Sequence, residues 1–478
     1  MEILIGREAE IKILHDAFNS PSSEFLAIYG RRRIGKTFFI RKVLSENMAF
    51  YMTGASNATT DEHLSIFYSA LQHMKASAVT LPTMPHNWFE AFELLKKNIT
   101  NERPGKKVIF FDELPWIARS RSKFLTALEH FWNSWASARQ DIFLIVSGSA
   151  TSWITGKILN NHGGLHNRVT QRINLSAFTL KETEAFLKAK NICLSRYQIL
   201  EIFMVLGGIP FYLDQLQPGR SSFQEIDRLA FSKNGLLRTE YNNLYHSIFK
   251  HPEQHIAIIE TLATKPQGLT REKLIKGLKI KDGGSLSKTL NELSESGFIG
   301  LEYPYKAKRK NTVYRITDPY SLFYHKFLKD SSNTGEGSWL SRIDHPGWRA
   351  WSGYAFETIC YAHMPEIKKA LGISGVYTQS SSWVDIDDSI QIDLLLERKD
   401  KIIHLCEVKF SEDVYVLSKE VKANIQRKIS AFRMAKTPKQ PIFPTLITTY
   451  GLKQNIHSQG FIQNVITMDD LFDSPASS

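Results

Sequence analysis

The sequence predicts an α/β fold that begins with a parallel sheet, and two observations carry this prediction. Between residues 1 and 175, short apolar runs alternate with segments whose apolar residues recur at helical spacing. Parallel strands joined by helices produce this alternation, because such strands are buried on both faces. Beyond residue 345 a second segment of strands and helices follows a middle part that is mostly helical. We therefore expect two α/β regions separated by helices.

Three short apolar runs are the expected strands of the first sheet. They read FLAIYG, KKVIFFD and DIFLIVSG, and they end at Gly30, Asp112 and Gly148. Their lengths are those of buried strands, which typically have four to eight residues. The segment KTFFIRKVLSE after the first run has apolar residues at helical spacing, so we expect a helix there.

The stretch GRRRIGKT, residues 30–37, is a phosphate-binding loop (P-loop) signature. Its glycines let successive backbone N–H groups point at phosphate oxygens, while Lys36 reaches the β- and γ-phosphates and Thr37 faces a magnesium ion. The helix that follows would place the phosphates at a helix N-terminus, which favours anions. The signature therefore predicts a site for ATP and Mg²⁺. The expected nucleotide contacts are Gly30, Arg31, Arg32, Arg33, Ile34, Gly35, Lys36 and Thr37.

A P-loop also needs a carboxylate at the end of a neighbouring strand, and the run KKVIFFD supplies it. We expect Asp112 to hold the magnesium ion and Glu113 to polarise the attacking water as the catalytic base. The third run ends in Ser147 and Ser149, whose small polar side chains can approach the γ-phosphate. Ordinary turn serines are the alternative for this pair.

Six motifs occur in a fixed order: ILIGREAEIKIL, YGRRRIGKT, FFDELPW, LIVSGSATSWI, HGGLHNRVTQRI and GGIPFYL. Together they resemble the archaeal ATPase family, a group of AAA+-related P-loop NTPases of the signal-transduction type. The resemblance covers about residues 1 to 245. It implies a P-loop ATPase core over residues 1–175, with Ile5, Gly6 and Arg7 beside the adenine. It also implies that GGIP lies in a helical lid over residues 176–248.

Four arginines near the predicted site have roles that the sequence leaves open. Arg31, Arg32 and Arg33 could face the nucleotide, a subunit interface or a nucleic-acid backbone. Arg168, in the segment LHNR, is expected to follow the last strand of the core, where related ATPases place a charge that senses the γ-phosphate. Arg168 would stabilise the transition state in cis or across the interface of a homo-oligomer. An ordinary solvated arginine is the alternative.

Composition and charge limit the class of protein. A chain of 478 residues is too long for one ordinary core, and its net charge of +12 favours a polyanionic partner such as DNA. Its three cysteines are far apart and form no CxxC pair, which suits a reducing cytoplasm and argues against structural zinc. No apolar run approaches 18 residues and the N-terminus is not a signal peptide, so we expect a cytoplasmic protein without a membrane partner.

Residues 249–330 predict a winged helix. The segments GLTREKLIKGL and GGSLSKTLNELSESGFIGLEY indicate two helices joined by a turn, and a hairpin follows them. The second helix could enter the major groove of DNA while the hairpin contacts phosphates. A module that makes only protein contacts is the alternative. The cations at the tip of the hairpin are Lys306, Lys308, Arg309 and Lys310.

Residues 345–478 contain a second set of charged side chains. If QIDLLLERKDKIIHLCEVKF forms a hairpin, Asp393 lies opposite Glu407, with Cβ atoms about 5 Å apart. Lys409 shares their face, because side chains alternate along a strand. Carboxylates that hold Mg²⁺ and a lysine that orients or deprotonates water are what metal-dependent phosphodiester cleavage requires. Glu357, in the helical segment GYAFETICYAHM, could complete the metal site.

This arrangement resembles the PD-(D/E)xK nuclease-like domain that commonly follows the ATPase in the same family. The resemblance covers about residues 345–435, and Ile392 stands where a proline usually precedes the first aspartate. The polar, glycine-rich segment SSNTGEGS favours a linker over residues 331–344. Two hypotheses follow. The first is an ATPase that acts on DNA or is regulated by it, with a metal-dependent nuclease domain. The second is a nucleotide-dependent signalling switch whose C-terminal domains, including a nuclease fold kept as a scaffold, only bind partners.

Overall fold

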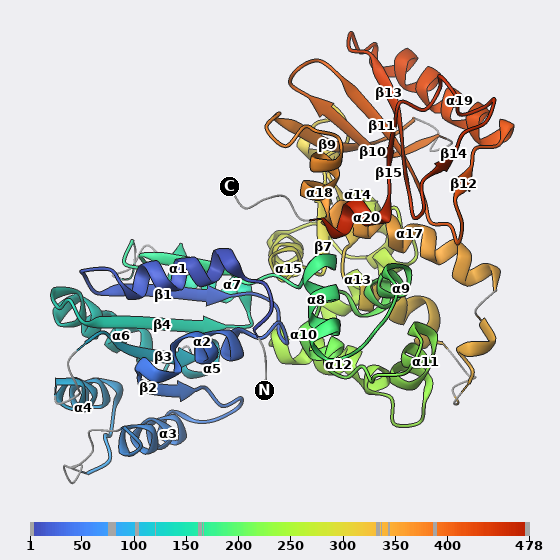
Figure 1. Cartoon of the computed structure of the whole chain (residues 1–478). Coiled ribbons are helices and arrows are strands. Elements are labelled where there is room, and N and C mark those ends of the chain that lie inside the picture. The colour runs from blue at the N-terminus through green and yellow to red at the C-terminus, as the bar shows by residue number, and fades with distance from the viewer. Residues whose placement is uncertain are drawn as a thin grey trace. The chain divides into compact units, whose positions relative to one another are not determined.

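The computed structural model describes residues 4–74, 83–100, 105–119, 121–160, 165, 167–330, 335, 337–342, 345–385 and 390–473 (Figure 1). The chain forms two compact units, residues 1–177 and 178–478. Across the described ranges, no helix is long and apolar enough to cross a membrane.

A five-stranded parallel sheet forms the centre of the first unit, which confirms the predicted α/β class. The sheet order is β2-β3-β4-β1-β5. The three predicted runs form β1, β3 and β4, whereas β2 and β5 at the two edges were not predicted. β5, QRIN, has no apolar run, whereas β2, MAFYMT, has an apolar run like those of the predicted strands. β2 was therefore overlooked, although its pattern was typical of a strand. The strands are β1 (Glu24–Tyr29), β2 (Met48–Thr53), β3 (Lys107–Asp112), β4 (Ile142–Gly148) and β5 (Gln171–Asn174).

Helices cover both faces of this sheet (Figure 1). Aromatic side chains of α3, α4 and α6 pack on one face, where Phe67, Phe92 and Phe124 contact Phe111 of β3. The predicted helix after the P-loop is present as α2. The helices are α1 (Glu8–Phe18), α2 (Lys36–Leu44), α3 (Thr60–Gln72), α4 (Trp88–Thr100), α5 (Leu114–Ile117), α6 (Phe124–Ser134) and α7 (Thr151–Ile154).

The second unit begins with a helical segment. Its helices are α8 (Leu180–Ala189), α9 (Arg196–Leu206), α10 (Pro210–Leu213), α11 (Ser222–Ile226) and α12 (Leu236–Ile248). The GGIP motif separates α9 from α10. Its Gly208 passes so close to Phe178 that a Cβ atom there would lie 1.9 Å from the Phe178 carbonyl oxygen. The segment also packs on the C-terminal region, since the Leu180 backbone N–H at the start of α8 donates to His363 Nε2 over 3.0 Å.

Four helices and a three-stranded antiparallel sheet of order β6-β8-β7 follow. The two helices and the hairpin expected within residues 249–330 correspond to α14, α15 and β7–β8. The elements are α13 (Glu253–Ala263), β6 (Leu269–Thr270), α14 (Arg271–Leu278), α15 (Gly284–Glu295), β7 (Ile299–Glu302), β8 (Val313–Ile316) and α16 (Pro319–Phe323).

The described part of the predicted linker is anchored in an aromatic cluster. Trp339 is fully buried, and its ring stacks on Phe231 at 5.1 Å and meets Trp348 edge-on at 5.3 Å. The Asp227 carboxylate accepts hydrogen bonds from the backbone N–H groups of Gly337 and Trp339. Residues 337–342 therefore do not form an open spacer.

The C-terminal region contains a mixed sheet of order β15-β13-β11-β10-β9. β9, β10 and β11 are antiparallel, whereas β11, β13 and β15 are parallel. Helix α19 packs on one face through Ile425 and Phe432. The elements are α17 (Pro346–Ala362), α18 (Met364–Ala370), β9 (Thr378–Val384), β10 (Gln391–Arg398), β11 (Ile403–Lys409), β12 (Tyr415–Val416), α19 (Lys419–Lys436), β13 (Ile442–Thr448), β14 (Leu452–Lys453), β15 (Asn464–Ile466) and α20 (Met468–Phe472).

Candidate functional site

The P-loop connects the end of β1 to the start of α2. Gly30 and Gly35 adopt φ angles of 140° and 86°, which side chains rarely tolerate. A Cβ atom on Gly30 would also lie 2.2 Å from the Leu175 carbonyl oxygen. Gly35 caps α2 without a side chain, so no side chain covers the first N–H groups of this helix. The loop therefore has the backbone that an anion site at a helix N-terminus needs.

The Lys36 side chain is buried and lies across the loop. Its Nζ atom donates to the carbonyl oxygens of Gly30 and Arg31, over 3.0 and 3.1 Å, and to Ser149 Oγ over 2.9 Å. Burial lowers the pKa of Lys36, against the opposing effect of the carboxylates of Glu113 and Asp112. The ammonium group is thus held inside the P-loop, where the signature predicts that the phosphates bind.

Asp112 ends β3 beside the start of α2. Thr37 Oγ1 donates to Asp112 Oδ2 over 2.7 Å, and the Ser147 hydroxyl donates to Asp112 Oδ1. Burial raises the pKa of Asp112, so a nearby cation would stabilise its charged form. A hydroxyl and a carboxylate are the oxygen ligands that Mg²⁺ uses. The Thr37 and Asp112 side chains therefore fit a magnesium ion.

Glu113 adopts the left-handed conformation, with φ of 50°, at the start of α5. Its carboxylate accepts from Ser149 Oγ over 2.5 Å and from the Ser149 backbone N–H over 3.2 Å. Ser149 therefore bridges Lys36 and Glu113. The sequence alone had also allowed Ser149 to be an ordinary turn serine. One hydrogen-bonded network brings these predicted residues together: Lys36, Thr37, Asp112, Glu113, Ser147 and Ser149.

Residues predicted to lie beside the adenine are well anchored. Arg7 is buried, its φ angle is 67°, and its Nη2 atom donates to the Ser176 carbonyl oxygen over 2.6 Å. Gly6 also has a positive φ angle, of 61°. Arg7 thus connects the first described residues to the chain that follows β5, and its contact with adenine stays a prediction.

The arginines of the P-loop differ in exposure. Arg32 is exposed, Arg31 and Arg33 are half-buried, and Ile34 is buried. Arg33 also takes a left-handed conformation, with φ of 72°. The exposed side chain of Arg32 is the one most accessible to a partner.

The prediction that Arg168 follows the last core strand was wrong. Arg168 is exposed and lies in a turn before β5, which pairs with β1 at the edge of the sheet. The error arose because Ile173 is the one buried side chain of β5, so the strand has no apolar run. Residues 162–164 and 166, which belong to the same motif, lie outside the described residues.

Comparisons with known proteins agree with this site. Residues 4–216 match the family model of an ATPase domain predominantly from Archaea. The chain carries an ATPase domain. An uncharacterised protein of Methanocaldococcus jannaschii is 25% identical over 422 residues, which cover 86% of this chain and 88% of that protein. The match to the ATPase family model assigns ATP hydrolysis to this chain as its enzymatic activity.

Two solved structures are also similar. The Walker-type ATPase of Pyrococcus abyssi has a TM-score of 0.49 and 17% identity, over 68% of this chain and 96% of that chain. The ORC2 protein of Aeropyrum pernix, solved as ADPNP and ADP complexes, has a TM-score of 0.39 and 15% identity, over 76% of this chain and 95% of that chain.

The second predicted site lies on β10 and β11. The register of β10 with β11 runs from Leu394 opposite Cys406 to Glu397 opposite Ile403, and Asp393 and Glu407 directly follow its Leu394–Cys406 end. Against β9 the register of β10 shifts between Ile392 and Leu395, and the opposed positions of Asp393 and Glu407 stay a prediction. Glu407 is nevertheless not an unpaired carboxylate. Its Oε1 atom lies 2.8 Å from Lys409 Nζ and its Oε2 atom 2.8 Å from Lys428 Nζ. Sequence reasoning missed Lys428, because it reaches the site from α19, 21 residues further along the chain.

Glu357 of α17 lies in the same electrostatic neighbourhood. Burial raises the pKa of Glu357 to about 8, and the Asp393 carboxylate adds to the shift. Burial also raises the pKa of Asp393, whose Oδ1 atom accepts from Gln391 Nε2 over 2.8 Å. The pKa of Glu407 shifts the other way. Burial alone would raise it, but the charges of Lys428 and Lys409 lower it below its usual value.

The charges of this cluster balance without a metal. The raised pKa of Glu357 favours its protonated form at neutral pH, both lysines pair with Glu407, and Lys428 also acts electrostatically on Asp393. Within the part of the chain that the structure describes, no group of three or more His, Cys, Asp or Glu side chains is arranged to hold a metal ion. As arranged, the cluster therefore does not fit a divalent cation, and the metal site at Glu357, Asp393 and Glu407 stays a prediction.

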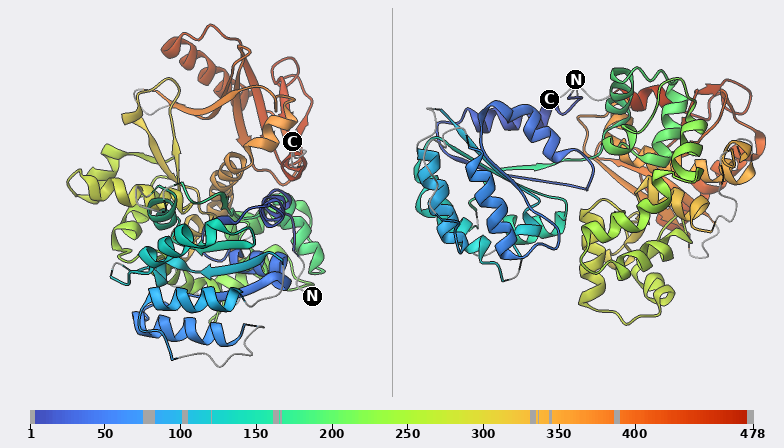
Figure 2. Two further views of the ribbon diagram at one scale, coloured as in Figure 1. Left: turned by 90° about the vertical axis from the view of Figure 1, so that its left-hand side faces the viewer. Right: turned by 90° about the horizontal axis from the view of Figure 1, so that it is seen from below.

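The tip of the β7–β8 hairpin is attached to the C-terminal sheet (Figure 2). Tyr305 is buried, its backbone N–H donates to the Ser382 carbonyl oxygen of β9 over 2.9 Å, and its ring lies 5.0 Å from that of Phe432. Lys306 Nζ lies 3.6 Å from Glu397. Of the predicted cations at the tip, Lys308 and Lys310 are exposed, and the side chain of Arg309 is not among the described ones.

Proposed function

We propose that this protein hydrolyses ATP in a Mg²⁺-dependent reaction at the P-loop site. The observation that carries the proposal is the hydrogen-bonded network at the carboxyl ends of β1, β3 and β4. Lys36 contacts Ser149, which donates to the Glu113 carboxylate. The Glu113 backbone N–H donates in turn to Asp112 Oδ1 over 3.1 Å, which connects the P-loop lysine to both acidic residues. A bound Mg²⁺, held by Thr37 and Asp112, would supply charge that offsets the phosphates.

The residues of this network would divide the work. The Lys36 ammonium and the first N–H groups of α2 would bind the β- and γ-phosphates. In this structure Ser149 Oγ accepts a hydrogen bond from Lys36. When Lys36 turns to the phosphates, it would release Ser149. The Glu113 carboxylate, now held by Ser149, would then accept a proton from the attacking water. Arg168 would add positive charge at the γ-phosphate in cis or from a second copy of the chain.

Binding and hydrolysis measured separately test these roles. Lys36→Ala should abolish tight ATP binding, because a charge-assisted contact to the phosphates is lost. Lys42→Ala is the matched control, since Lys42 lies exposed on the same helix. Tight ATP binding by Lys36→Ala would refute the proposed phosphate site.

We further propose that DNA binds to the second unit and regulates the ATPase. Helices α14 and α15, the β7–β8 hairpin and the net charge of +12 support this proposal. Lys308 and Lys310 are the tip cations available to phosphates, because Lys306 already faces Glu397. In this proposal residues 249–330 act as a winged helix. The test is titration of duplex DNA into the full chain while ATP hydrolysis and fluorescence anisotropy are recorded.

A metal-dependent nuclease in residues 345–478 is the second candidate function. The predicted opposition of Asp393 and Glu407, with Lys409 beside Glu407, favours it. The pairing of Glu407 with two lysines favours a binding module without cleavage instead, as does the attached hairpin tip. A nicking assay with Mg²⁺ or Mn²⁺ separates the two. Cleavage that disappears in Asp393→Ala and Lys409→Ala would establish the nuclease.

A further inference from the structure

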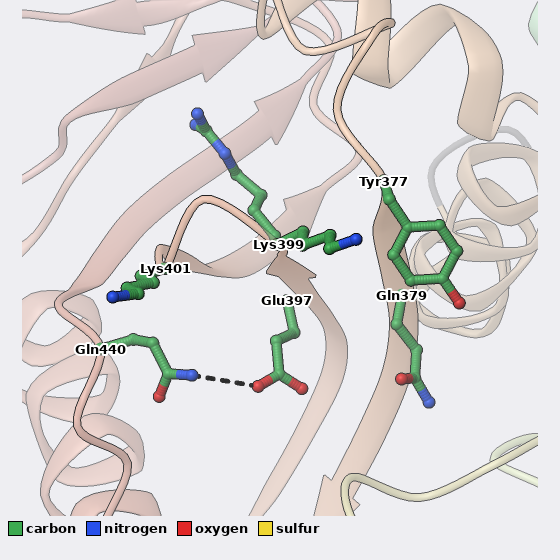
Figure 3. A pocket seen from close by; sticks show the side chains of 7 residues that line it. Tyr377, Gln379, Glu397, Lys399, Lys401 and Gln440 are labelled. Atoms are coloured by element: carbon green, nitrogen blue, oxygen red, sulfur yellow. Dashed lines mark hydrogen bonds between the residues drawn. The ribbon is translucent and has the colours of Figure 1, made fainter.

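A pocket of about 430 Å³ opens at the β10–β11 turn, at the opposite end of β10 from Asp393 (Figure 3). Its lining combines an aromatic ring, three cations, two amides and one carboxylate. This volume lies within the usual range of small-ligand sites, about 300 to 1,000 Å³. The lining residues are Tyr377, Gln379, Glu397, Arg398, Lys399, Lys401 and Gln440.

The ring of Tyr377 is presented to solvent by a fixed backbone. Tyr377 is 72% exposed, more than any other aromatic among the exposed large apolar side chains of the described residues. Its carbonyl oxygen accepts from the Lys399 backbone N–H over 3.0 Å, which holds the start of β9 against the turn. A ring face displayed in this way is a stacking platform for a nucleic-acid base.

The cations of the pocket divide into an occupied and an available set. Arg398 Nε donates to Asp400 Oδ1 over 2.8 Å, so its guanidinium is already paired. The exposed side chains of Lys399 and Lys401 make no ion pair with any described residue. These two ammonium groups are therefore the ones that can bind a phosphate.

The carboxylate decides which ligand fits. Glu397 lies between Gln440 and Gln379, its cross-strand partner on β9 (Figure 3). Its Oε1 atom accepts from Gln440 over 3.3 Å and from the Tyr305 hydroxyl over 3.2 Å. This atom also lies 3.6 Å from Lys306 Nζ, so Oε2 is the oxygen that Glu397 offers to a ligand. A carboxylate repels an acidic peptide or a phosphate placed next to it, but it accepts a hydrogen bond from the amino group of a base. The pocket thus offers a ring for a base, acceptors for its edge, and cations for the phosphates that flank it.

We propose that this pocket binds one unstacked nucleotide of a single-stranded DNA segment, with the base on Tyr377 and the two phosphates that flank it at Lys399 and Lys401, whose side chains point to opposite sides of the turn (Figure 3). A duplex keeps its bases paired and stacked, so the pocket selects single strands or strand ends. Glu397 selects bases that carry an amino group, so cytosine is bound more tightly than thymine. The inference rests on the proposed DNA binding and names the strand form that the C-terminal sheet recognises.

The test is fluorescence anisotropy of the full chain with labelled single-stranded oligo(dC) and oligo(dT), without ATP or divalent metal. Tyr377→Ala should weaken binding about 5- to 150-fold, which is the stacking contribution of one base, whereas Tyr377→Phe should bind like wild type. Lys399→Ala with Lys401→Ala should lower the salt slope by up to about 0.7 per lost phosphate contact. Lys419→Ala with Lys453→Ala, two exposed lysines outside the pocket, should leave the slope unchanged. Glu397→Gln should reduce the preference for oligo(dC).

The outcomes separate this inference from the proposed function. Single-strand binding that is equal in Tyr377→Ala and wild type would overturn the pocket assignment, and so would competition by free nucleotides or an acidic peptide as strong as that by the oligonucleotide. Duplex binding that depends on Lys308 and Lys310, together with no single-strand binding that depends on Tyr377, would overturn the pocket alone. No binding to either form of DNA would overturn both proposals.

Discussion

Replacing Lys428 with methionine should destabilise β11 more than replacing Lys409 with methionine does. Both lysines lie 2.8 Å from the Glu407 carboxylate, but the Lys428 side chain is 13% exposed and that of Lys409 is 35% exposed. A hydrogen bond to a buried charged group contributes about 1.5–3 kcal/mol. A pair that water reaches contributes about 0–1 kcal/mol, because solvent screens it. Methionine retains most of the apolar stem, so the comparison isolates the charge.

Hydrogen exchange measured by mass spectrometry can detect this difference locally. A chain with two units does not unfold in one step, so a single melting temperature would mix their stabilities. Amides of β11 open with the cluster, and their protection should fall about 10- to 150-fold in Lys428→Met and at most about 5-fold in Lys409→Met. Peptides from β1 and β3 provide the internal control, because they belong to the first unit.

Two results would refute this reasoning. Equal losses of protection in the two variants would mean that exposure does not decide the strength of the pairs. Increased protection of β11 on addition of Mg²⁺ or Mn²⁺ without nucleotide would mean that the cluster is not balanced by Lys409 and Lys428. The second result would also support the predicted metal site, particularly if Asp393→Ala abolished the effect.

Other predictions concern the remaining charged groups. Glu113→Gln should slow ATP hydrolysis about 10²- to 10⁴-fold, the range of general-base catalysis, while ATP binding measured by calorimetry is retained; an unchanged rate would contradict the assignment. Arg168→Ala should lower kcat strongly, and mixing it with Glu113→Gln should restore activity only if Arg168 acts on a neighbouring subunit. Lys308→Ala with Lys310→Ala should lower the salt slope of duplex binding by up to about 0.9 per lost phosphate contact; an unchanged slope would leave the hairpin as a protein-contact element. The folded-state pKa of Glu357 is raised to about 8, so the stability that its protonated form contributes should fall as the pH rises toward 8. Glu357→Gln should flatten that fall in hydrogen exchange of α17, and an unchanged pH profile would exclude Glu357 as its cause.

The ATP site could be predicted from the sequence because its information is local. The P-loop needs glycines at fixed spacing, and Asp112 and Glu113 directly follow a buried strand. Parallel strands that start and end at the same edges bring such residues together without further information. The register of β10 with β11 was predictable for a similar reason, since a short turn fixes the register of a hairpin.

The missing parts depend on contacts between distant segments. Edge strand β5 lacks the apolar run that reveals a central strand, since Ile173 is its one buried side chain. Lys428 of α19 pairs with Glu407 of β11, and Tyr305 of the hairpin tip donates to Ser382 of β9. No sequence spacing predicts either contact. Trp339 lies in a polar, glycine-rich stretch, where composition favours an open linker although the ring is fully buried.

The β7–β8 hairpin, which pairs with β6, also packs on elements of the C-terminal region. Besides Tyr305, it contributes Arg315, a buried residue of β8 whose guanidinium pairs with Glu302 at 2.5 Å and donates to Thr358 of α17 over 3.2 Å. Separating the hairpin from α17 would break the hydrogen bond to Thr358, whereas Glu302, on β7 of the same hairpin, would stay paired with Arg315. Losing a hydrogen bond made by a buried charged group costs about 1.5–3 kcal/mol. DNA bound at Lys308 would therefore act on a hairpin that contacts both β9 and α17. β9 pairs with β10, which carries Asp393, and α17 carries Glu357.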